Sequence, residues 1–252
     1  METIGVIPAR WGSTRFPGKS LAMLGGKPVI RWVYERAGQA RRLASLAVAT
    51  DDERIRTAVE AFGGRVVMTK NTHPSGTDRV AEAIGGMKEG VAVNIQGDEP
   101  FVDPALIDSL VGAMEADESW DMATAAVPIR DRTELNDPSV VKVVWDAENR
   151  ALFFSRSVIP FDRDHGYDTC DALYWRHLGI YAYRIGFLRR LVSTPPCRTE
   201  NVEKLEQLRA LHIGARIKVL EAASAGIGID TPGDLARAGE MLMSAAGGRV
   251  KR

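Results

Sequence analysis

Short apolar runs alternate with amphipathic segments in the first half of the chain, and this rhythm constrains the fold more than any other feature. Apolar runs typical of buried strands occur at 3–9, 46–50, 65–69 and 91–96. Apolar residues at helical spacing occur in segments 28–42, 52–62, 77–87 and 103–117. Strands that alternate with helices form mostly parallel sheets flanked by helices. The first half is therefore predicted to be an α/β layer.

Beyond about residue 121 this alternation stops. Strand patterns follow one another at 122–129, 139–146, 151–156, 175–184 and 216–222, and the first three are joined by short polar links without a clear helix. Amphipathic helices are predicted over 199–214, ending at Gly214, and over 231–245. We therefore expect one domain over 1–252, made of a βα half (1–120), a mixed-strand portion (121–225) and a closing helix (226–245).

Charge and cysteine content exclude several classes of protein. The 252 residues carry 33 basic and 33 acidic side chains, so no net field draws the chain to nucleic acid or to a membrane surface. The N-terminal apolar run lacks a basic lead and predicts a strand rather than a signal peptide, and no apolar stretch has the length of a membrane helix. The two cysteines, Cys170 and Cys197, are not in a metal or redox spacing, which fits a reducing cytoplasm.

The segment "IPARWGSTRFPGKSL" (7–21) places three cations, Arg10, Arg15 and Lys19, in a loop without an acid. It ends in Gly-Lys-Ser, like the ATP-binding P-loop. That motif has four residues between its glycines and a helix from its lysine, whereas five residues separate Gly12 from Gly18 here. The following "LAMLGGKP" is moreover too rich in Gly and Pro for a helix. A solvated basic loop is the simpler alternative, but three cations after a strand favour a polyphosphate site.

Two acids are candidate ligands for a metal on that phosphate. Asp98 follows the strand 91–96 in "VNIQGDEP", and Asp230 lies in "GIGIDTPGDL". Mg²⁺ takes one or two carboxylates together with phosphate oxygens. Asp98 is equally explained as a turn-forming or capping acid, and Asp230 as a helix cap, because Thr231 and Pro232 follow it. The pair together with the basic loop is more specific than either acid alone.

Nine stretches of the sequence resemble the sugar cytidylyltransferases in order and spacing and cover nearly the whole chain. They are "IPAR.GSTRFPGK", "GGKP", "ATDDERI", "MTKNTHPSGTDR", "VNIQGDEPFV", "VKVVWDAE..ALFFSRSVIPFDRD", "RHLGIYAYR", "LEQLRAL" and "GIDTPGDL". Within the family, "FSR", "RHLGIY" and "LEQLR" resemble the branch that activates 3-deoxy-D-manno-octulosonate (KDO). The resemblance implies a Rossmann-like nucleotidyltransferase fold with a mixed-strand portion for sugar binding and dimerisation.

The same resemblance implies a reaction and its partners. A cytoplasmic, Mg²⁺-dependent homodimer is expected to transfer CMP from CTP to the anomeric hydroxyl of KDO, releasing pyrophosphate and making CMP-KDO for lipopolysaccharide. KDO and an amino-substituted KDO both stay open as substrates. The alternatives are a nucleotidyltransferase that uses UTP or GTP on a sugar phosphate, a P-loop kinase or NTPase, and a non-catalytic nucleotide-binding regulator, and the sequence disfavours each of them.

Residue roles follow by match to the family's motifs. For the nucleotide and the metal, the implied residues are Arg10, Ser13, Arg15 and Lys19 on the triphosphate, and Asp98 and Asp230 on Mg²⁺; Arg79 and Gln96 are candidates for the cytosine and ribose. For the sugar they are Arg156, His177, Tyr181, Glu206 and Gln207. Arg15, Lys19, Asp98 and Asp230 are expected to carry the chemistry. A surface position is the alternative for Arg79, and a structural role is expected for His73, His165 and His212.

Overall fold

The computed structural model describes residues 1–12, 15–164 and 173–247. Its contacts divide the chain into two compact units. The N-terminal unit comprises Thr3–Gly86, Ala92–Asp108 and Gly226–Arg252, and the central unit comprises Met1–Glu2, Met87–Val91 and Ser109–Ala225. Among the described residues, no helix combines the length and apolar character that crossing a membrane requires.

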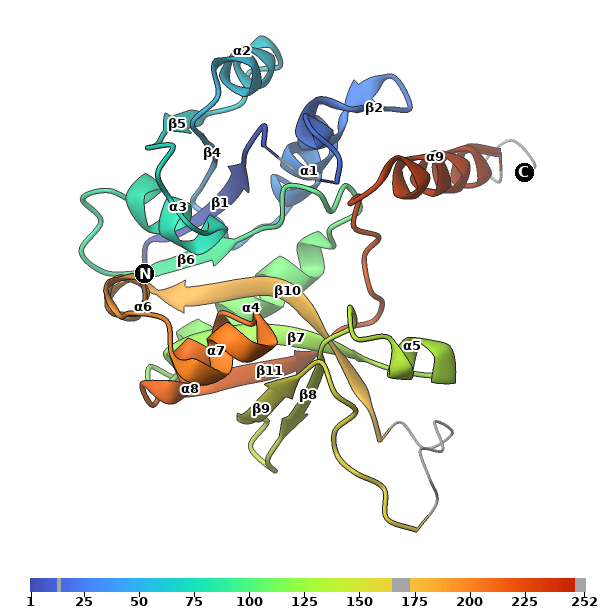
Figure 1. The fold of residues 1–252 in the computed structure, drawn as a ribbon. Helices are drawn as coiled ribbons and strands as arrows, with labels where there is room; N and C mark the ends of the chain where they lie inside the picture. Colours follow the sequence, from blue (N-terminus) through green and yellow to red (C-terminus); the bar gives the residue numbers. More distant parts are fainter. Residues whose placement is uncertain (13–14, 165–172, 248–252) are drawn as a thin grey trace. The chain divides into compact units, whose positions relative to one another are not determined.

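The N-terminal unit is a parallel sheet covered by helices, as the apolar rhythm predicts (Figure 1). Its strands lie in the order β6-β1-β4-β5. The elements are β1 (Thr3–Ala9), η1 (Lys19–Leu21), β2 (Met23–Leu24), β3 (Lys27–Pro28), α1 (Val29–Ala37), β4 (Ser45–Thr50), α2 (Glu53–Ala61), β5 (Val66–Met68), α3 (Gly76–Ala83), β6 (Val91–Asn94) and α9 (Pro232–Gly247). Helices α1, α2 and α3 pack on β1, β4 and β5, and the apolar side chains of β1 are buried. The carboxyl ends of β1 and β6 therefore point to one edge of this sheet, where α/β folds bind ligands.

The central unit is a mixed sheet. Strand β7 (Met122–Pro128) pairs parallel with β11 (Ile217–Glu221) and antiparallel with β10 (Trp175–Arg184). Strand β10 also pairs with β8 (Lys142–Trp145), which forms an antiparallel pair with β9 (Ala151–Ser155). The helices are α5 (Arg132–Asn136), α6 (Ile185–Ser193), α7 (Arg198–Glu203) and α8 (Gln207–His212), and α4 (Pro104–Ala116) has residues in both units. The expected mixed-strand portion is confirmed.

The predicted helix over 199–214 is wrong, because the structure has two helices there, α7 and α8. They are separated at Lys204, whose φ of 55° is left-handed. In a continuous helix the Glu203 carbonyl would accept a backbone hydrogen bond from Gln207. It accepts instead from Arg156 Nε at 2.7 Å. A tertiary hydrogen bond has thus replaced the helical one. The short helix α5, between β7 and β8, is a second difference from the prediction, which placed only polar links there.

Candidate active site

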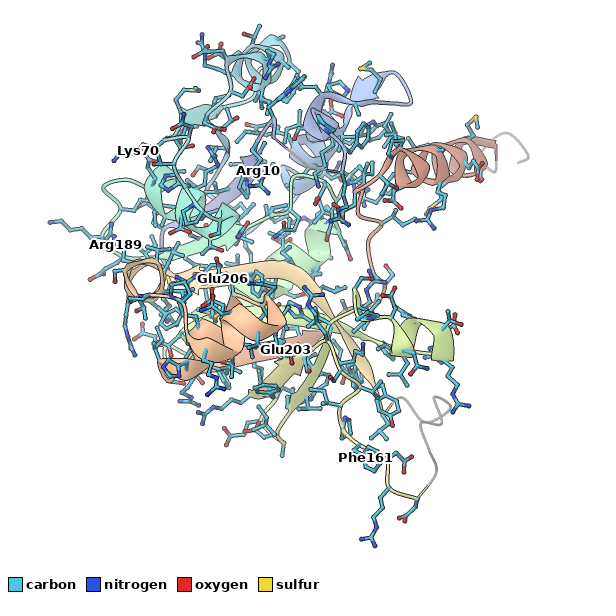
Figure 2. All side chains as sticks on the ribbon, in the orientation of Figure 1. Arg10, Lys70, Phe161, Arg189, Glu203 and Glu206 are labelled. Atoms are coloured by element: carbon cyan, nitrogen blue, oxygen red, sulfur yellow. The ribbon has the colours of Figure 1, made fainter. Side chains whose placement is uncertain are left out.

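A cavity of about 310 Å³ lies in the N-terminal unit at the carboxyl ends of β1 and β6. Its walls come from the loop after β1, the segment before α3 with the start of α3, the turn after β6 and the segment before α9. The lining residues are Pro8, Ala9, Arg10, Arg15, Lys19, Ser20, His73, Pro74, Ser75, Gly76, Arg79, Gln96, Gly97, Asp98 and Asp230. Seven of the sequence-predicted site residues therefore share one cavity. Arg10 is exposed at its rim (Figure 2), and Ser13 lies outside the described residues.

The loop after β1 is not a P-loop in the structure either. Gly18 lies in the left-handed region with φ 71°, and its amide donates to the Trp11 carbonyl at 3.0 Å, which closes the base of the loop. Lys19 begins a three-residue 3-10 helix, and the chain then forms the β2–β3 hairpin instead of an α-helix. The rejection of the P-loop is confirmed. Lys19 nevertheless lines the cavity, from the start of the 3-10 helix.

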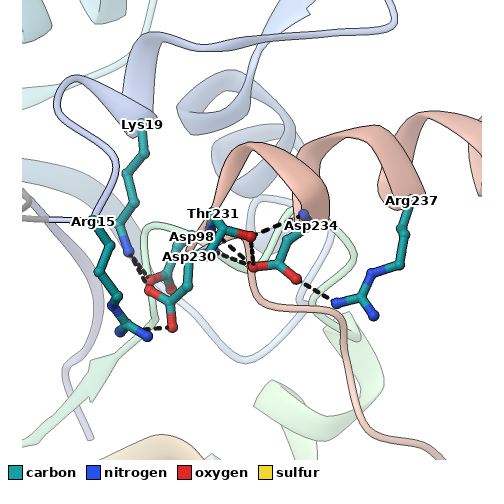
Figure 3. Close-up of polar contacts among 7 residues, drawn as sticks. All are labelled: Arg15, Lys19, Asp98, Asp230, Thr231, Asp234 and Arg237. Atoms are coloured by element: carbon teal, nitrogen blue, oxygen red, sulfur yellow. Dashed lines mark hydrogen bonds and ion pairs between the residues drawn. The ribbon is translucent and has the colours of Figure 1, made fainter.

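Lys19 joins the two predicted metal acids (Figure 3). Its Nζ donates to Asp98 Oδ2 at 2.5 Å and to Asp230 Oδ1 at 3.0 Å. The Arg15 Nη2 donates to the second oxygen of Asp230, also at 3.0 Å. Burial by itself lowers the pKa of Lys19, but the Asp98 and Asp230 carboxylates outweigh burial, and the pKa lies above its ordinary value. Residues 79 and 211 positions apart thus form one charged cluster.

Helix capping does not explain Asp230. The Thr231 Oγ1 accepts from the Asp234 amide at 3.2 Å, and the Asp234 carboxylate accepts from the Thr231 amide at 2.9 Å. This reciprocal pair is a capping box for α9. The Asp230 carboxylate is therefore not needed at the helix end and contacts Lys19 and Arg15 instead. The Asp98 carbonyl accepts from the Ile229 amide at 2.8 Å, so the segments that carry the two acids are joined by their backbones.

These carboxylates fit a magnesium ion. Both reach the same ammonium group, so two anionic oxygens already converge on one cation. Over the described ranges no group of three or more His, Cys, Asp or Glu side chains is placed to hold a metal. A site with two protein carboxylates, completed by phosphate and water oxygens, is typical of Mg²⁺.

Arg79 is buried rather than on the helix surface, so the surface explanation is wrong. It is 4% exposed, and its guanidinium lies 3.2 Å from Asp51 Oδ1 and bonds Thr69 Oγ1. Ser75 caps α3 by accepting from the Asp78 amide. The first turn of α3 is thereby fixed at the cavity wall, with Arg79 beneath it.

His73 lines the cavity, although the sequence predicts only a structural role for it. Its Nε2 bonds Glu82 Oε2, and this contact is the main cause that lowers the pKa of Glu82. The Lys70 amide donates to the same Glu82 oxygen at 3.0 Å. One signal in "NTHPSGTDR" could have placed His73 at the cavity. His73 comes just before Ser75, which caps α3, and a segment that enters a helix N-terminus lines the edge of an α/β sheet.

The predicted sugar residues lie in the central unit. His177 and Tyr181 are on one face of β10, as expected, and their ring centroids are 5.4 Å apart. Strand alternation places them there, and an irregularity between Leu178 and Tyr181 brings them together, because His177 pairs with Ala126 and Tyr181 with Thr124, only two positions apart on β7. Burial lowers the pKa of His177 to about 3, and burial followed by the Glu206 carboxylate raises the pKa of Tyr181 above its ordinary value. Both side chains are therefore neutral at physiological pH.

Thr124 on β7 favours one tautomer of His177. Its Oγ1 lies 2.8 Å from the Ile180 carbonyl, 3.1 Å from the Leu178 carbonyl and 3.0 Å from His177 Nε2. Two carbonyls thus compete for the single hydroxyl proton, which favours a protonated Nε2 as the donor to Oγ1. The neutral ring then has Nδ1 as its acceptor.

Gln207 is the first residue of α8, and Glu206 precedes it, just after the left-handed Lys204. Figure 2 labels Glu206 and also Glu203, the last residue of α7. Gln207 is buried, at 6% exposure. Arg156 contacts the turn just before them: its guanidinium donates to the carbonyls of Pro138 at 2.8 Å, Glu203 at 2.7 Å and Lys204 at 3.5 Å. Four of the sugar residues thus lie on β10 and at the start of α8, and Arg156 holds the turn before α8.

Known proteins resemble this chain in sequence and in fold. A sequence model of the family described as "Cytidylyltransferase" matches residues 4–217. A 3-deoxy-manno-octulosonate cytidylyltransferase of Geobacter sulfurreducens is 47% identical, over 96% of this chain and 100% of its own. An 8-amino-3,8-dideoxy-manno-octulosonate cytidylyltransferase of Shewanella pealeana is 50% identical, over 93% of this chain and 96% of its own. A solved CMP:2-keto-3-deoxy-manno-octonic acid synthetase complexed with CTP superposes with a TM-score of 0.92 at 42% identity, over 97% of this chain and 100% of that one.

Proposed function

The chain belongs to the cytidylyltransferase family, and from that premise we propose that it transfers CMP from CTP to the anomeric hydroxyl of KDO, giving CMP-KDO and pyrophosphate. The product would serve lipopolysaccharide biosynthesis. The observation that carries the proposal is the convergence of Arg15, Lys19, Asp98 and Asp230 in one cavity of a chain 47% identical to a KDO cytidylyltransferase over nearly all of its length.

The N-terminal unit supports the nucleotide half of the reaction. Attack on the α-phosphate needs positioning and neutralisation of charge on the phosphates more than covalent catalysis. Arg10, Arg15 and Lys19 line the cavity and are the groups we assign to the triphosphate and the departing pyrophosphate. Arg79 and Gln96, on the same cavity, are assigned to the cytosine and ribose, and Ser13 is assigned to the phosphates by its place in the loop.

We assign Asp98 and Asp230 to Mg²⁺, because their carboxylates already share a cation. When bound, the ion would neutralise phosphate charge and lower the pKa of a coordinated hydroxyl. The protein's own part is to keep the two carboxylates convergent and to supply Lys19 and Arg15 beside them. No side chain is then required as a separate general base.

The central unit supports recognition of a sugar with many hydroxyls. Neutral His177, with Nδ1 as acceptor, and neutral Tyr181, with a phenolic donor, suit hydroxyl groups. Gln207 offers a donor and an acceptor, and Glu206 accepts. Arg156 is our candidate for the carboxylate of the sugar, since its guanidinium has five N–H groups and bonds three carbonyls, one of them at 3.5 Å.

The test is pyrophosphate release with each of the four nucleoside triphosphates, with and without KDO and Mg²⁺. Release is expected with CTP alone among the four, and only when KDO and Mg²⁺ are both present. Release from CTP that does not depend on KDO, or equal release with UTP, contradicts the proposal. Rates with 8-amino-3,8-dideoxy-manno-octulosonate in the same assay decide between the two sugars, since relatives named for each are almost equally similar.

We also propose a homodimer in the cytoplasm, where CTP is made. Large apolar side chains exposed on the central unit support the dimer: Leu152, Phe161, Leu173 and Val202 are 57%, 74%, 43% and 75% exposed. Leu152 lies on β9, which pairs on one side with β8. Apolar side chains beside an open strand edge are typical of an interface between subunits. Cys197 is a free, buried thiol, which fits a reducing compartment.

A further inference from the structure

The Asp234 carboxylate makes an unusually dense set of contacts at the start of α9 (Figure 3). One oxygen, Oδ2, accepts from the Asp230 amide at 3.1 Å, the Thr231 amide at 2.9 Å and the Thr231 hydroxyl at 2.8 Å. The other oxygen accepts from Arg237, one turn further along α9. The side chain is 15% exposed. Asp234 therefore accepts from the backbone amides of both Asp230 and Thr231.

These contacts bear on Asp230. An aspartate just before a helix is drawn to the free amides of the first turn. Asp230 is in that position, but Asp234 and Thr231 already occupy the amides around it. The Asp230 carboxylate is left to bond Lys19 and Arg15 on the cavity side.

We propose that Asp234 is a positioning residue for Asp230: by capping α9 in its place, it directs the Asp230 carboxylate toward Lys19 and the other acid of the cavity. The role rests on the proposed function only insofar as Asp230 holds Mg²⁺. Groups that orient metal ligands typically change metal affinity or activity about 10–100-fold when they are removed. Loss of Asp234 thus raises the Mg²⁺ requirement while both proposed metal acids are still present.

Asp103 provides a matched control for the loss of a helix cap. It precedes Pro104 at the start of α4, as Thr231 precedes Pro232 at the start of α9, and its Oδ1 accepts from the Ala105 amide at 2.9 Å. Like Asp234 it belongs to the N-terminal unit, but it does not line the cavity. D103A and D234A each lose a cap, and both are expected to melt at a lower temperature than the wild type.

The kinetic test is the Mg²⁺ concentration at half-maximal turnover. It is expected to rise about tenfold in D234A and less in D234N, whose amide oxygen still accepts, with no change in D103A. The KM for KDO is expected to stay within about twofold in all three variants, because no sugar residue is altered. Equal Mg²⁺ requirements in D234A and D103A overturn the proposal.

The structural test needs neither metal nor turnover. In metal-free crystals of D234A, the Asp230 carboxylate is expected to leave Lys19 and turn toward the amides of α9, whereas in D234N, whose amide oxygen still accepts, it is expected to stay bonded to Lys19. A carboxylate that still bonds Lys19 in D234A overturns the proposal, whatever the activity of the variant. If the wild type transfers no CMP, the proposed function fails, and this comparison still decides the role of Asp234.

Discussion

Two carboxylates share one ammonium group in the N-terminal unit, and at the scale of single residues this sharing determines what each acid contributes. The side chain of Lys19 is 19% exposed, that of Asp98 24% and that of Asp230 43%. Removing the charge of one acid leaves the ammonium its other partner, so the cost to folding is small. It would also halve the carboxylates available to the proposed Mg²⁺, so the expected cost to the reaction is large.

Asp98→Asn and Asp230→Asn are therefore each expected to lower kcat at least about a hundredfold, the scale on which loss of one preorganised electrostatic group is felt. Circular dichroism and thermal unfolding should show a folded protein in both cases. The measurement is pyrophosphate release at saturating CTP and KDO over a Mg²⁺ series. Near-normal turnover of either variant at high Mg²⁺ would remove that residue from the metal site.

His177, one of the candidate sugar residues, makes the stability of the protein depend on pH. Burial lowers its pKa in the folded state to about 3, from 6.5 in the unfolded state. Between these values the unfolded state binds one more proton, so stability rises with pH in this window and is lost as the pH falls. Above pH 6.5 the contribution of His177 is fully present.

Acidification from pH 7 to pH 5 should then cost about 2 kcal/mol of unfolding free energy through His177. The His177→Gln variant cannot take up this proton. Its loss of unfolding free energy between pH 7 and pH 5 should therefore be smaller than that of the wild type by about 2 kcal/mol. Urea unfolding at pH 7, 6 and 5 measures both slopes, and the carboxylates common to the two proteins cancel in the difference. Identical slopes would mean that His177 takes up its proton in the folded state as readily as in the unfolded state, and would contradict the lowered pKa.

At the scale of elements, the position of Asp98 depends on how closely the turn after β6 approaches β1. A Cβ atom on Gly97 would lie 2.8 Å from the Pro8 carbonyl oxygen, a backbone atom that cannot move aside cheaply. Glycine is thus required where the two segments meet. The same approach places Asp98 next to Lys19.

Gly97→Ala is expected to push the two segments apart, lowering stability by roughly 1–3 kcal/mol, as overpacking does. It should also lower kcat, since Asp98 moves with its turn. Gly86→Ala is the control, because no atom lies within 4 Å of the added Cβ. Chemical denaturation and pyrophosphate release measure the two effects. A Gly97→Ala enzyme with wild-type kcat would show that the approach does not position Asp98.

At the scale of the whole molecule, the two units divide the proposed reaction between them. The candidate nucleotide and metal residues belong to the N-terminal unit, and the candidate sugar residues belong to the central unit. The exposed apolar side chains cited for a dimer belong to the central unit as well. A dimer through that unit would leave each N-terminal unit to bind its own nucleotide.

Leu152→Glu tests this arrangement by placing a charge on β9. Sedimentation at micromolar concentration should show a dimer for the wild type and a monomer for the variant, because a buried, unpaired charge is costly. Met23→Glu is the control, since Met23 is 60% exposed on the N-terminal unit, close to the 57% of Leu152. A Leu152→Glu variant that stays dimeric, or a monomeric wild type, contradicts the proposed interface.

The sequence by itself determined the long strands and the residue types of the candidate nucleotide site. Strands at 3–9 and 175–184 were predicted with the bounds that β1 and β10 have, because apolar periodicity reports burial directly. Cations in a Gly- and Pro-rich loop and an acid after a buried strand were visible as residue types. Their meeting in one cavity follows from the rule that strand ends in a parallel sheet share an edge.

Only the tertiary structure decided the features that depend on distant partners. The break between α7 and α8 arises because Arg156, far away in the sequence, takes the Glu203 carbonyl. The burial of Arg79 depends on Asp51 and Thr69, and the place of His73 depends on Glu82. Whether Asp230 caps a helix or faces the cavity was decided by Asp234, four residues later, together with Lys19, 211 positions away. Local pattern reports which side chains are buried, whereas the partner of a polar group is known only once the chain has folded.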